Sequence, residues 1–292
     1  MKRFALILLF LAAASPICAQ QTALASPDAK SLAMGGAAMG LPAGSHAIYG
    51  NASMAVFSRH PVQISSSYCG QKEFDHYAVT GHWRFDNVNL VQAGWRQFMR
   101  RSGGDDMVLD AGYSRRLGER WAVGVVGRYL RLKNEEGPED ALAADLSASW
   151  VLPLERVGSY STLRAGARLG NLGGFFSGSE GTLPTDLTIG AAFDTFLTDA
   201  HEITVAADLG YIFTPRPGRG VRCAAGVEYN LMQLVQLRAG YHFGRRDDFF
   251  PSFGSAGAGV RILHIRLDFA YLFAAKGTSL RNAYSLSFGL DF

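Results

Sequence analysis

The seven histidines of this 292-residue sequence are its clearest candidates for metal ligands or for general acids and bases. No two of them have the spacing of a metal-binding pair, and no serine lies in a nucleophile elbow. His82 and His242 are expected on the same side of the strands as carboxylates such as Asp145 and Asp208, and so could approach them. Ordinary hydrogen bonding in the interior is the better explanation of such contacts than catalysis. We therefore expect no enzyme, no metal site and no cofactor. The histidines are His46, His60, His76, His82, His201, His242 and His264.

The run GGAAMG at residues 35–40 resembles a phosphate-binding glycine loop only in composition. Phosphate loops connect a strand to a helix inside a βαβ unit, and no strand pattern precedes this run. Close packing of backbone against another element is the better use of Gly35, Gly36 and Gly40. The formal net charge of +3 is close to balance, and the basic residues are scattered. Nucleic acid is therefore not an expected partner.

In strand-like segments such as VRCAAGVEY, LVQLRAGYHFG and HIRLDFAYLF, the charged residues all lie on the polar side of an alternating pattern. Both signs are present among many small residues, and a buried charge needs a partner. We expect these side chains to form ion pairs in a crowded interior and not to act as acid–base pairs. The expected interior charges are Asp110, Arg128, Asp145, Arg164, Arg168, Asp194, Asp208, Arg222, Glu228, Arg238, Arg266 and Asp268.

Apolar and small or polar residues alternate over most of the chain after residue 61, with the period of β-strands. The chain ends in such a pattern, NAYSLSFGLDF, and its last residue is Phe292. About 14 segments of this kind are expected, most of them near the roughly 9 to 11 residues with which a tilted strand crosses a bilayer. Their expected extents are 62–68, 76–85, 88–98, 106–115, 120–131, 141–152, 160–170, 186–196, 202–213, 220–230, 234–244, 253–262, 264–274 and 282–292.

The connections between these segments are alternately long and short, which is typical of outer-membrane barrels with long loops outside. NLGGFFSGSEGTLPT and KNEEGPED are long, whereas DN and NLMQ are short, and aromatic residues lie near the strand ends as in interfacial girdles. We predict an all-β fold, a transmembrane antiparallel β-barrel of about 14 strands. An exported soluble β-sandwich is the alternative, and the scarcity of Lys and Glu on the polar parity disfavours it.

The first 19 residues have the layout of a secretory signal peptide, with Lys2 and Arg3, an apolar run, and Ala19 before the expected cleavage. The apolar run is too short to anchor the chain in a bilayer. Cys18 lies where a lipoprotein cysteine would, but the bulky Ile17 before it disfavours lipidation. We expect an exported protein of a Gram-negative outer membrane, with the barrel in residues 59–292. The other two cysteines, Cys69 and Cys223, are expected to stay unpaired.

Residues 20–58 are too apolar and glycine-rich for a solvated tail. The stretch AKSLAMGGAAMGLPAGSHAIYGNASMAVFS resembles the opening of the PorV/PorQ proteins, members of the FadL-like superfamily of outer-membrane barrels. Ala52 departs from that pattern, since proline is usual at this position. The resemblance implies a 14-stranded barrel with residues 20–58 folded into the lumen as a plug. The matching positions are Met34, Gly35, Gly36, Tyr49, Asn51 and, less closely, Ala52 and Ser53; Gly40 belongs to the same segment.

The resemblance also implies an accessory role in type IX protein secretion, in which outer loops bind cargo or partner subunits. Phe175 with Phe176, and Phe249 with Phe250, lie in expected outer loops, and each pair is either a binding patch or part of a loop that folds inward. Two alternatives remain: a FadL-like channel for small hydrophobic molecules, which needs an apolar pocket beside the plug, and a structural barrel of unassigned role. Outer-membrane lipid is the expected surrounding in all three.

Overall fold

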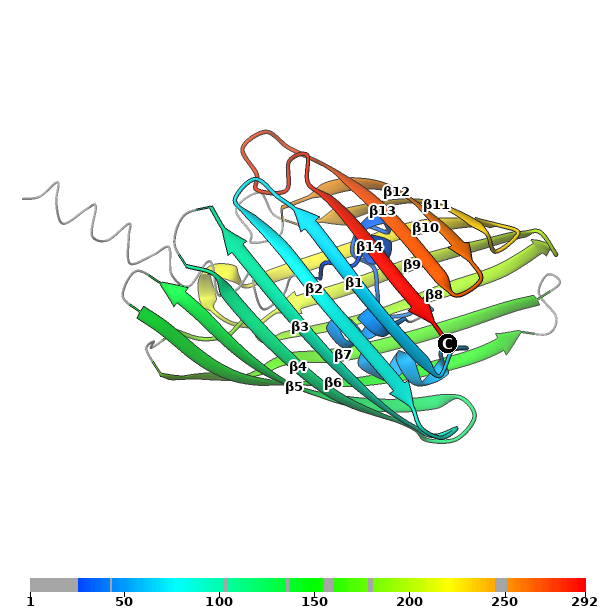
Figure 1. Ribbon diagram of the computed structural model, residues 1–292, viewed down its shortest axis with the longest axis horizontal. Coiled ribbons are helices and arrows are strands. Elements are labelled where there is room, and N and C mark those ends of the chain that lie inside the picture. The colour runs from blue at the N-terminus through cyan, green and yellow to red at the C-terminus, as the bar shows by residue number, and fades with distance from the viewer. Residues whose placement is uncertain are drawn as a thin grey trace, which may run out of the picture.

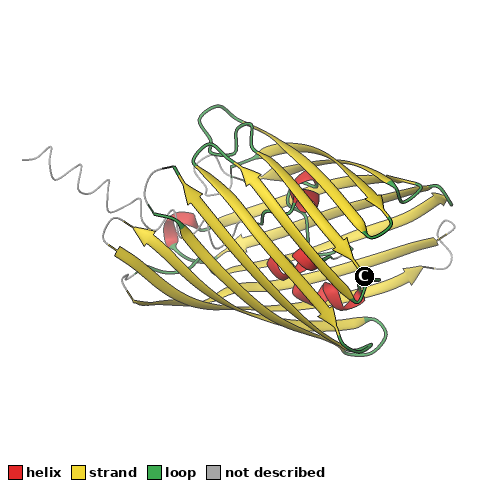
Figure 2. Ribbon diagram, in the orientation of Figure 1, coloured by secondary structure: helices red, strands yellow, loops and turns green. Residues whose placement is uncertain are grey.

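Fourteen antiparallel strands form one closed barrel in the computed structural model, which describes residues 26–42, 44–101, 104–134, 137–154, 160–177, 181–244 and 251–292. Each strand pairs with its neighbours along the chain, and β1 (Val62–Gly70) pairs with β14 (Tyr284–Asp291) (Figures 1 and 2). Closure leaves no unpaired strand edge, which a bilayer requires because its core offers no water to free N–H and C=O groups. The predicted barrel is therefore confirmed.

The strand boundaries follow the predicted extents closely on most of the barrel. The remaining strands are β2 (Phe74–Arg84), β3 (Asn89–Arg100), β4 (Asp106–Arg116), β5 (Trp121–Asn134), β6 (Gly137–Leu154), β7 (Tyr160–Ser177), β8 (Asp186–Thr198), β9 (His201–Ile212), β10 (Gly220–Leu231), β11 (Val235–Phe243), β12 (Phe253–Ile262) and β13 (Ile265–Ala274).

Two strands are much longer than predicted: β6 and β7 each have 18 residues, against the extents 141–152 and 160–170. The residues GPED begin β6, and β7 continues through Phe175 and Phe176, so the prediction that these stretches are outer loops was wrong. The reason is local composition. Gly173 and Gly174 carry no side chains, so this end of β7 lacks the alternation that identifies a strand.

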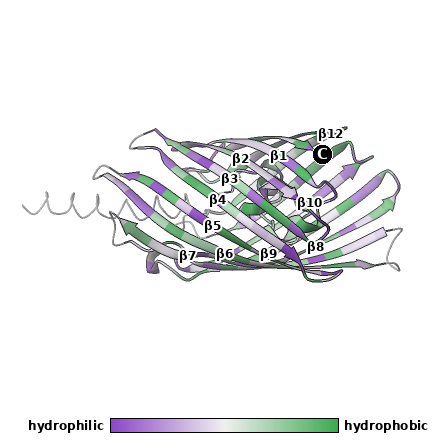
Figure 3. Ribbon diagram, turned by 60° about the horizontal axis from the view of Figure 1, so that its bottom comes forward, coloured by the Kyte–Doolittle hydropathy of each residue, from purple (hydrophilic) through white to green (hydrophobic). Residues whose placement is uncertain are grey.

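The outer face of the barrel is apolar because successive side chains of each strand point to opposite sides of the wall. Figure 3 shows hydrophilic and hydrophobic residues alternating along the strands. Large apolar side chains such as Leu209 and Leu237 are exposed on this face, where lipid covers them. Trp83 and Trp121 lie near the short-link ends of their strands, and Tyr241 lies near a long-loop end.

Residues 26–58 lie inside the barrel, where Figure 2 shows their short helices enclosed by the strands. They form α3 (Ala29–Ala33), η1 (Ser45–Tyr49) and η2 (Ala52–Phe57); a further single turn, η3 (Arg216–Gly218), lies between β9 and β10. Asp28 caps α3, since its Oδ2 accepts the Ser31 N–H at 3.0 Å. Among the residues described, no helix has the length and apolar character needed to cross a membrane.

Glycines in the wall let the backbone of this N-terminal segment lie directly against the backbone of the strands. A Cβ atom added to Gly226 would lie 2.6 Å from the Met34 carbonyl oxygen, and one added to Gly240 would overlap Met34 and Gly35. Gly35 has φ 72°, a conformation that glycine adopts without strain. Met34 itself is fully buried against three small wall residues, Ala192, Ala206 and Ala224.

We predict that Gly240→Ala destabilises the folded barrel by about 1–3 kcal/mol, because the new methyl group must displace the Met34–Gly35 backbone. The free energy of unfolding in urea, measured on protein refolded into liposomes, tests this. Gly174→Ala is the matched control, since a Cβ there meets nothing within 4 Å. Equal stability of the two variants would contradict the tight contact.

Candidate functional site

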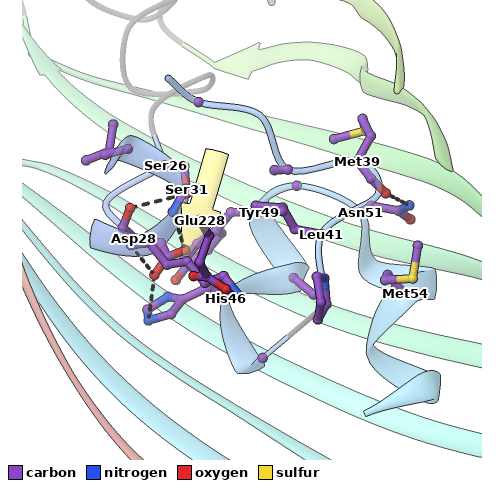
Figure 4. A pocket seen from close by; sticks show the side chains of 18 of the residues that line it. Ser26, Asp28, Ser31, Met39, Leu41, His46, Tyr49, Asn51, Met54 and Glu228 are labelled. Carbon is purple, nitrogen blue, oxygen red and sulfur yellow. Dashed lines mark hydrogen bonds and ion pairs between the residues drawn. The ribbon is translucent and has the colours of Figure 1, made fainter. Parts of the chain in front are cut away.

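A cavity of about 520 Å³ lies between the N-terminal segment and the wall of the barrel, and we call it the lumen cavity (Figure 4). Its lining reaches the long-loop end of the barrel at Cys69 and Leu280. It reaches the short-link end at Gln233 and Leu263. The cavity therefore borders both ends of the barrel interior.

The long-loop end of the lumen cavity is mixed, since Gln71, Arg222 and His242 line it together with an apolar group of side chains. Phe253, Leu272 and Leu280 line it and form one buried cluster, against which Leu32 of α3 packs. The channel alternative requires an apolar pocket beside the N-terminal segment, and these residues form an apolar part of a cavity that also has polar and charged lining residues.

The middle of the lumen cavity is charged. Lys30 Nζ lies 3.6 Å from Glu228 Oε1, and Glu228 also accepts a hydrogen bond from Arg238. Arg238 Nη1 in turn donates to Asp268 Oδ1 at 2.6 Å. Burial lowers the pKa of Lys30 to about 8, although Glu228 acts to raise it. Arg261, which also lines the cavity, adds to the positive charge near Lys30.

A second polar contact joins the start of α3 to η1 and β1. His46 Nε2 lies 3.8 Å from Asp28 Oδ1 (Figure 4). It also lies 3.2 Å from Ser67 Oγ. Burial lowers the pKa of His46, which therefore is neutral at pH 7. Burial would by itself raise the pKa of Asp28, but His46 and the Ser31 N–H lower it below its ordinary value. Asp28 is thus an ionised carboxylate that accepts hydrogen bonds from the N–H groups at the start of α3.

Asp208 of β9 binds the N-terminal segment through backbone N–H groups and not through a basic side chain. Its Oδ2 accepts the N–H groups of Ala38 and Met39 at 2.7 and 3.0 Å. Further along, Asn51 Nδ2 donates to the Met39 carbonyl oxygen at 2.8 Å and to Ser149 Oγ at 3.0 Å. These bonds fix the glycine-rich part of the segment to itself and to two sides of the wall.

Seven charged side chains form an alternating chain along the inner wall from β3 to β10, which we call the ion chain. Arg96 and Arg128 reach Asp110 at 3.1 and 2.6 Å, and Arg128 reaches Asp145 at 3.1 Å. Arg168 then bridges Asp145 and Asp186 at 3.0 and 3.6 Å, and Arg222 pairs with Asp186. These side chains are buried and have lost their hydration, so each charge needs a partner of opposite sign.

A bulge between β6 and β7 brings one backbone N–H into the ion chain. Asn171 has φ 55°, the strand register shifts beside it, and its N–H donates to Asp145 Oδ1 at 2.7 Å. Its side-chain oxygen accepts a hydrogen bond from Arg128. In a regular strand this N–H would bond the neighbouring strand. The bulge turns it toward the interior, where it binds a carboxylate.

The structure places every charge expected in the interior on the inner side of the wall, and ion pairs join most of them. Besides the pairs already described, Arg164 pairs with Asp194, and Arg266 pairs with Asp291 at 2.9 Å. The expected set omitted the partners Arg96, Asp186 and Asp291 and the segment residue Lys30. Arg96 carries the same parity signal as the others and was identifiable from the sequence, whereas Asp186 and Asp291 stand at strand ends.

The segment residue Tyr49 contacts the ion chain directly. The Arg96 guanidinium carbon lies 4.5 Å from the centre of the Tyr49 ring, and the Tyr49 hydroxyl reaches the Trp95 carbonyl oxygen at 3.5 Å. Burial raises the pKa of Tyr49, which stays a neutral phenol. Met34, Gly35, Gly36, Gly40, Tyr49 and Asn51 thus all belong to the interface between the segment and the wall.

The two phenylalanines of β7 have opposite environments. Phe175 points inward and packs on a buried cluster that includes Phe74, Phe98 and Leu183. Phe176 is 61% exposed. A role of Phe176 in binding stays a prediction, and Phe249 and Phe250 lie outside the described residues.

The histidines and cysteines form no catalytic arrangement among the residues that the structure describes. His82 Nε2 contacts the His60 carbonyl oxygen and His242 Nδ1 contacts the Gly35 carbonyl oxygen, both at 3.2 Å. No group of three or more His, Cys, Asp or Glu side chains with metal-binding geometry occurs in the described ranges. Cys69 and Cys223 are both free thiols.

The family model of type IX secretion system protein PorV matches residues 78–219, slightly under half of the chain. The resemblance that the opening segment indicates is thereby confirmed, and the match lies in the barrel, outside that segment. No curated protein matches the chain.

Solved barrels of similar fold include the toluene transporter TbuX of Ralstonia pickettii, with a TM-score of 0.61 at 12% identity over 90% of this chain and 98% of that chain. The Pseudomonas putida toluene transporter TodX gives 0.57 at 12% identity over 89% and 95%. The CymD monoaromatic hydrocarbon channel gives 0.55 at 11% identity over 92% and 98%. At these identities the likeness shows the fold, and the fold points to an outer membrane.

Ala52→Pro is expected to raise the free energy of unfolding by about 0.4–1 kcal/mol. Ala52 opens η2, where its N–H makes no intrahelical bond, and Asn51 already has the extended conformation that a following proline requires, with φ −121° and ψ 90°. Ala55→Pro, inside η2, is the control and should destabilise the protein. Similar losses of stability in urea unfolding for both variants would contradict this account of the departure at Ala52.

The free energy of unfolding is expected to rise between about pH 8 and 10.5, because the unfolded chain holds the Lys30 proton across this range and the folded protein releases it. The contribution is on the order of 3 kcal/mol. Urea unfolding of the native protein and of Lys30→Met over this range isolates it, since other titrating groups cancel in the difference. Parallel pH profiles would contradict burial of a charged Lys30.

Proposed function

We propose that this protein is an outer-membrane accessory of type IX protein secretion that binds cargo or partner subunits at the long-loop end of its barrel. The observation that carries the proposal is the match of the PorV family model to residues 78–219. This range runs from β2 to the residue before β10, and it includes the three longest strands. Export with cleavage of residues 1–19 is part of the same proposal.

The long-loop ends of β5, β6 and β7 supply a rigid surface for such binding, and we call them the outer platform. Phe74, Phe98, Val108 and Leu130 are buried beneath it, and Phe175 packs on them from β7. Beside Phe175, the exposed Phe176 is an aromatic side chain held by strand hydrogen bonding, so little conformational entropy is lost when a partner binds it. An aromatic anchor of this kind is typical of binding hot spots.

The N-terminal segment acts as a plug in this proposal. Its backbone contacts with Gly226 and Gly240 and its hydrogen bonds with Asp208 and Ser149 support a stable position inside the barrel. A plugged barrel suits a protein that works through its outer surface, because the membrane barrier is maintained while cargo is bound.

A channel for small hydrophobic molecules is the second candidate, and the lumen cavity favours it. The cavity is apolar where Leu272 and Leu280 line it and borders both ends of the barrel. Its middle carries Lys30, Glu228 and Arg261, so an apolar molecule would have to pass charged groups. A channel of this type should retain lipid or detergent in the lumen cavity after purification.

Phe176→Ser is expected to reduce the cargo or secretion subunits that co-purify from the native outer membrane by about tenfold or more, the loss for an aromatic hot spot. The measurement is a pull-down of tagged protein in mild detergent with mass spectrometry of proteins and lipids. Phe273→Ser is the matched control, because Phe273 is 59% exposed near the long-loop end of β13.

Equal recovery of partners with both variants would argue against the outer platform as the binding surface. Lipid bound in a fixed ratio, with no secretion subunit or cargo, would instead support the channel.

A further inference from the structure

Two neighbouring short links carry large apolar side chains at their tips. The β10–β11 link consists of Met232, Gln233 and Leu234, and the β12–β13 link has Leu263 followed by His264. Met232 is 68% exposed and Leu263 is 95% exposed. Figure 1 shows the two hairpins side by side at one end of the barrel.

The backbone conformation at these tips is also unusual for large side chains. Met232, Gln233 and Leu263 have φ of 53°, 56° and 54°, in the left-handed region that turns of this type usually fill with Asn, Asp or Gly. Solvation and backbone conformation would both favour small polar residues here if the tips stood in water. Transfer of a methionine or leucine side chain into an apolar medium offsets a cost of this kind.

The other described short links differ in charge. Asp86 lies in the β2–β3 link, Glu119 and Arg120 in the β4–β5 link, and Asp199 in the β8–β9 link. The β10–β11 and β12–β13 links contain no Asp, Glu, Lys or Arg. The charged links also expose Phe85 and Leu117, so the links differ in charge and not in apolar content.

Most strands of this sector are short, although β10 has 12 residues and β1, with 9, is as short as β11. β11, β12, β13 and β14 have 9, 10, 10 and 8 residues, against 18 for β6 and β7. A tilted strand needs about 9–11 residues to cross the hydrocarbon core, so nothing is left over to carry the tips clear of the membrane. A thin sector either thins the bilayer or places its turns in the interface.

The apolar outer surface continues without interruption into the tips. On β12 and β13 the exposed residues Val260, Ile262, Ile265 and Leu267 lead from the lipid-facing wall to Leu263. His264 stacks on Phe292 at 5.8 Å between ring centroids, and aromatic residues at strand ends mark the headgroup level.

We propose that the β10–β11 and β12–β13 hairpins insert their tips into the inner leaflet of the outer membrane. The occupant of this surface is phospholipid, because the tips continue the lipid-facing wall and the strands above them are only long enough to cross the bilayer. The proposal does not depend on a role in secretion.

The insertion determines where the lumen cavity opens. Gln233, Leu263 and Ile265 line its short-link end together with charged residues such as Arg261 and Arg266, so phospholipid borders only one side of this end. The charged links on the opposite side of the rim stand in the periplasm.

Spin labels at single cysteines test the insertion. The background replaces the three native cysteines, and the labelled variants are Met232→Cys and Leu263→Cys, with Glu119→Cys and Asp199→Cys as exposed controls on charged links. The refolded proteins are placed in phospholipid vesicles without any partner protein. Power saturation then compares collisions of each label with oxygen, which dissolves in lipid, and with a water-soluble nickel chelate.

Labels at 232 and 263 are expected to show a several-fold higher ratio of oxygen to nickel collisions than labels at 119 and 199. Equal ratios at all four positions would overturn the proposal and would leave a water-exposed patch that a periplasmic protein could cover. A variant that fails to refold is replaced by Gln233→Cys or Ile262→Cys in the same two hairpins, so the comparison is made in either case.

Discussion

Closure of the barrel in a bilayer imposes the constraint on which the other features depend. Lipid covers the outer wall, so that face is apolar, and every polar group must find its partner within the sheet or inside it. The ion chain from Arg96 to Arg222 is one answer to this constraint, because each of its carboxylates bridges two guanidinium groups. The bulge at Asn171 serves the same end by turning a backbone N–H toward Asp145.

The N-terminal segment meets two chemically different halves of the interior. Towards β8–β12 the segment's backbone lies directly against the wall at small residues such as Gly226 and Gly240, and Asp208 adds side-chain hydrogen bonds. Towards β3–β6 the contact is polar, with Gln92 and Ser114 both bonded to the Ala52 carbonyl oxygen. The lumen cavity remains along the first half, where Lys30 and Glu228 prevent a fully apolar filling.

The strands were predictable because the outer side of the wall faces lipid and the inner side faces a polar interior. Side chains of a strand point to the two sides in turn, so the sequence alternates with a period of two. Prediction failed where that rule carries no information. Gly173 and Gly174 hid the end of β7, the bulge at Asn171 depends on Asp145 from another strand, and Lys30 lies in a segment without periodicity. The apolar tips of the short links were visible in the sequence, but their exposure and left-handed backbone appear only in three dimensions.

The central claim is that residues 26–58 form part of the folded interior, held there by the wall. Amide hydrogen exchange of the protein in phospholipid nanodiscs tests it most directly, with attention to the N–H groups of Ala38 and Met39, which Asp208 accepts, and of Ser53, which Ser147 accepts. We expect these amides to exchange as slowly as those of the neighbouring strands. Exchange as fast as in exposed turns, with the strands still protected, would contradict the account.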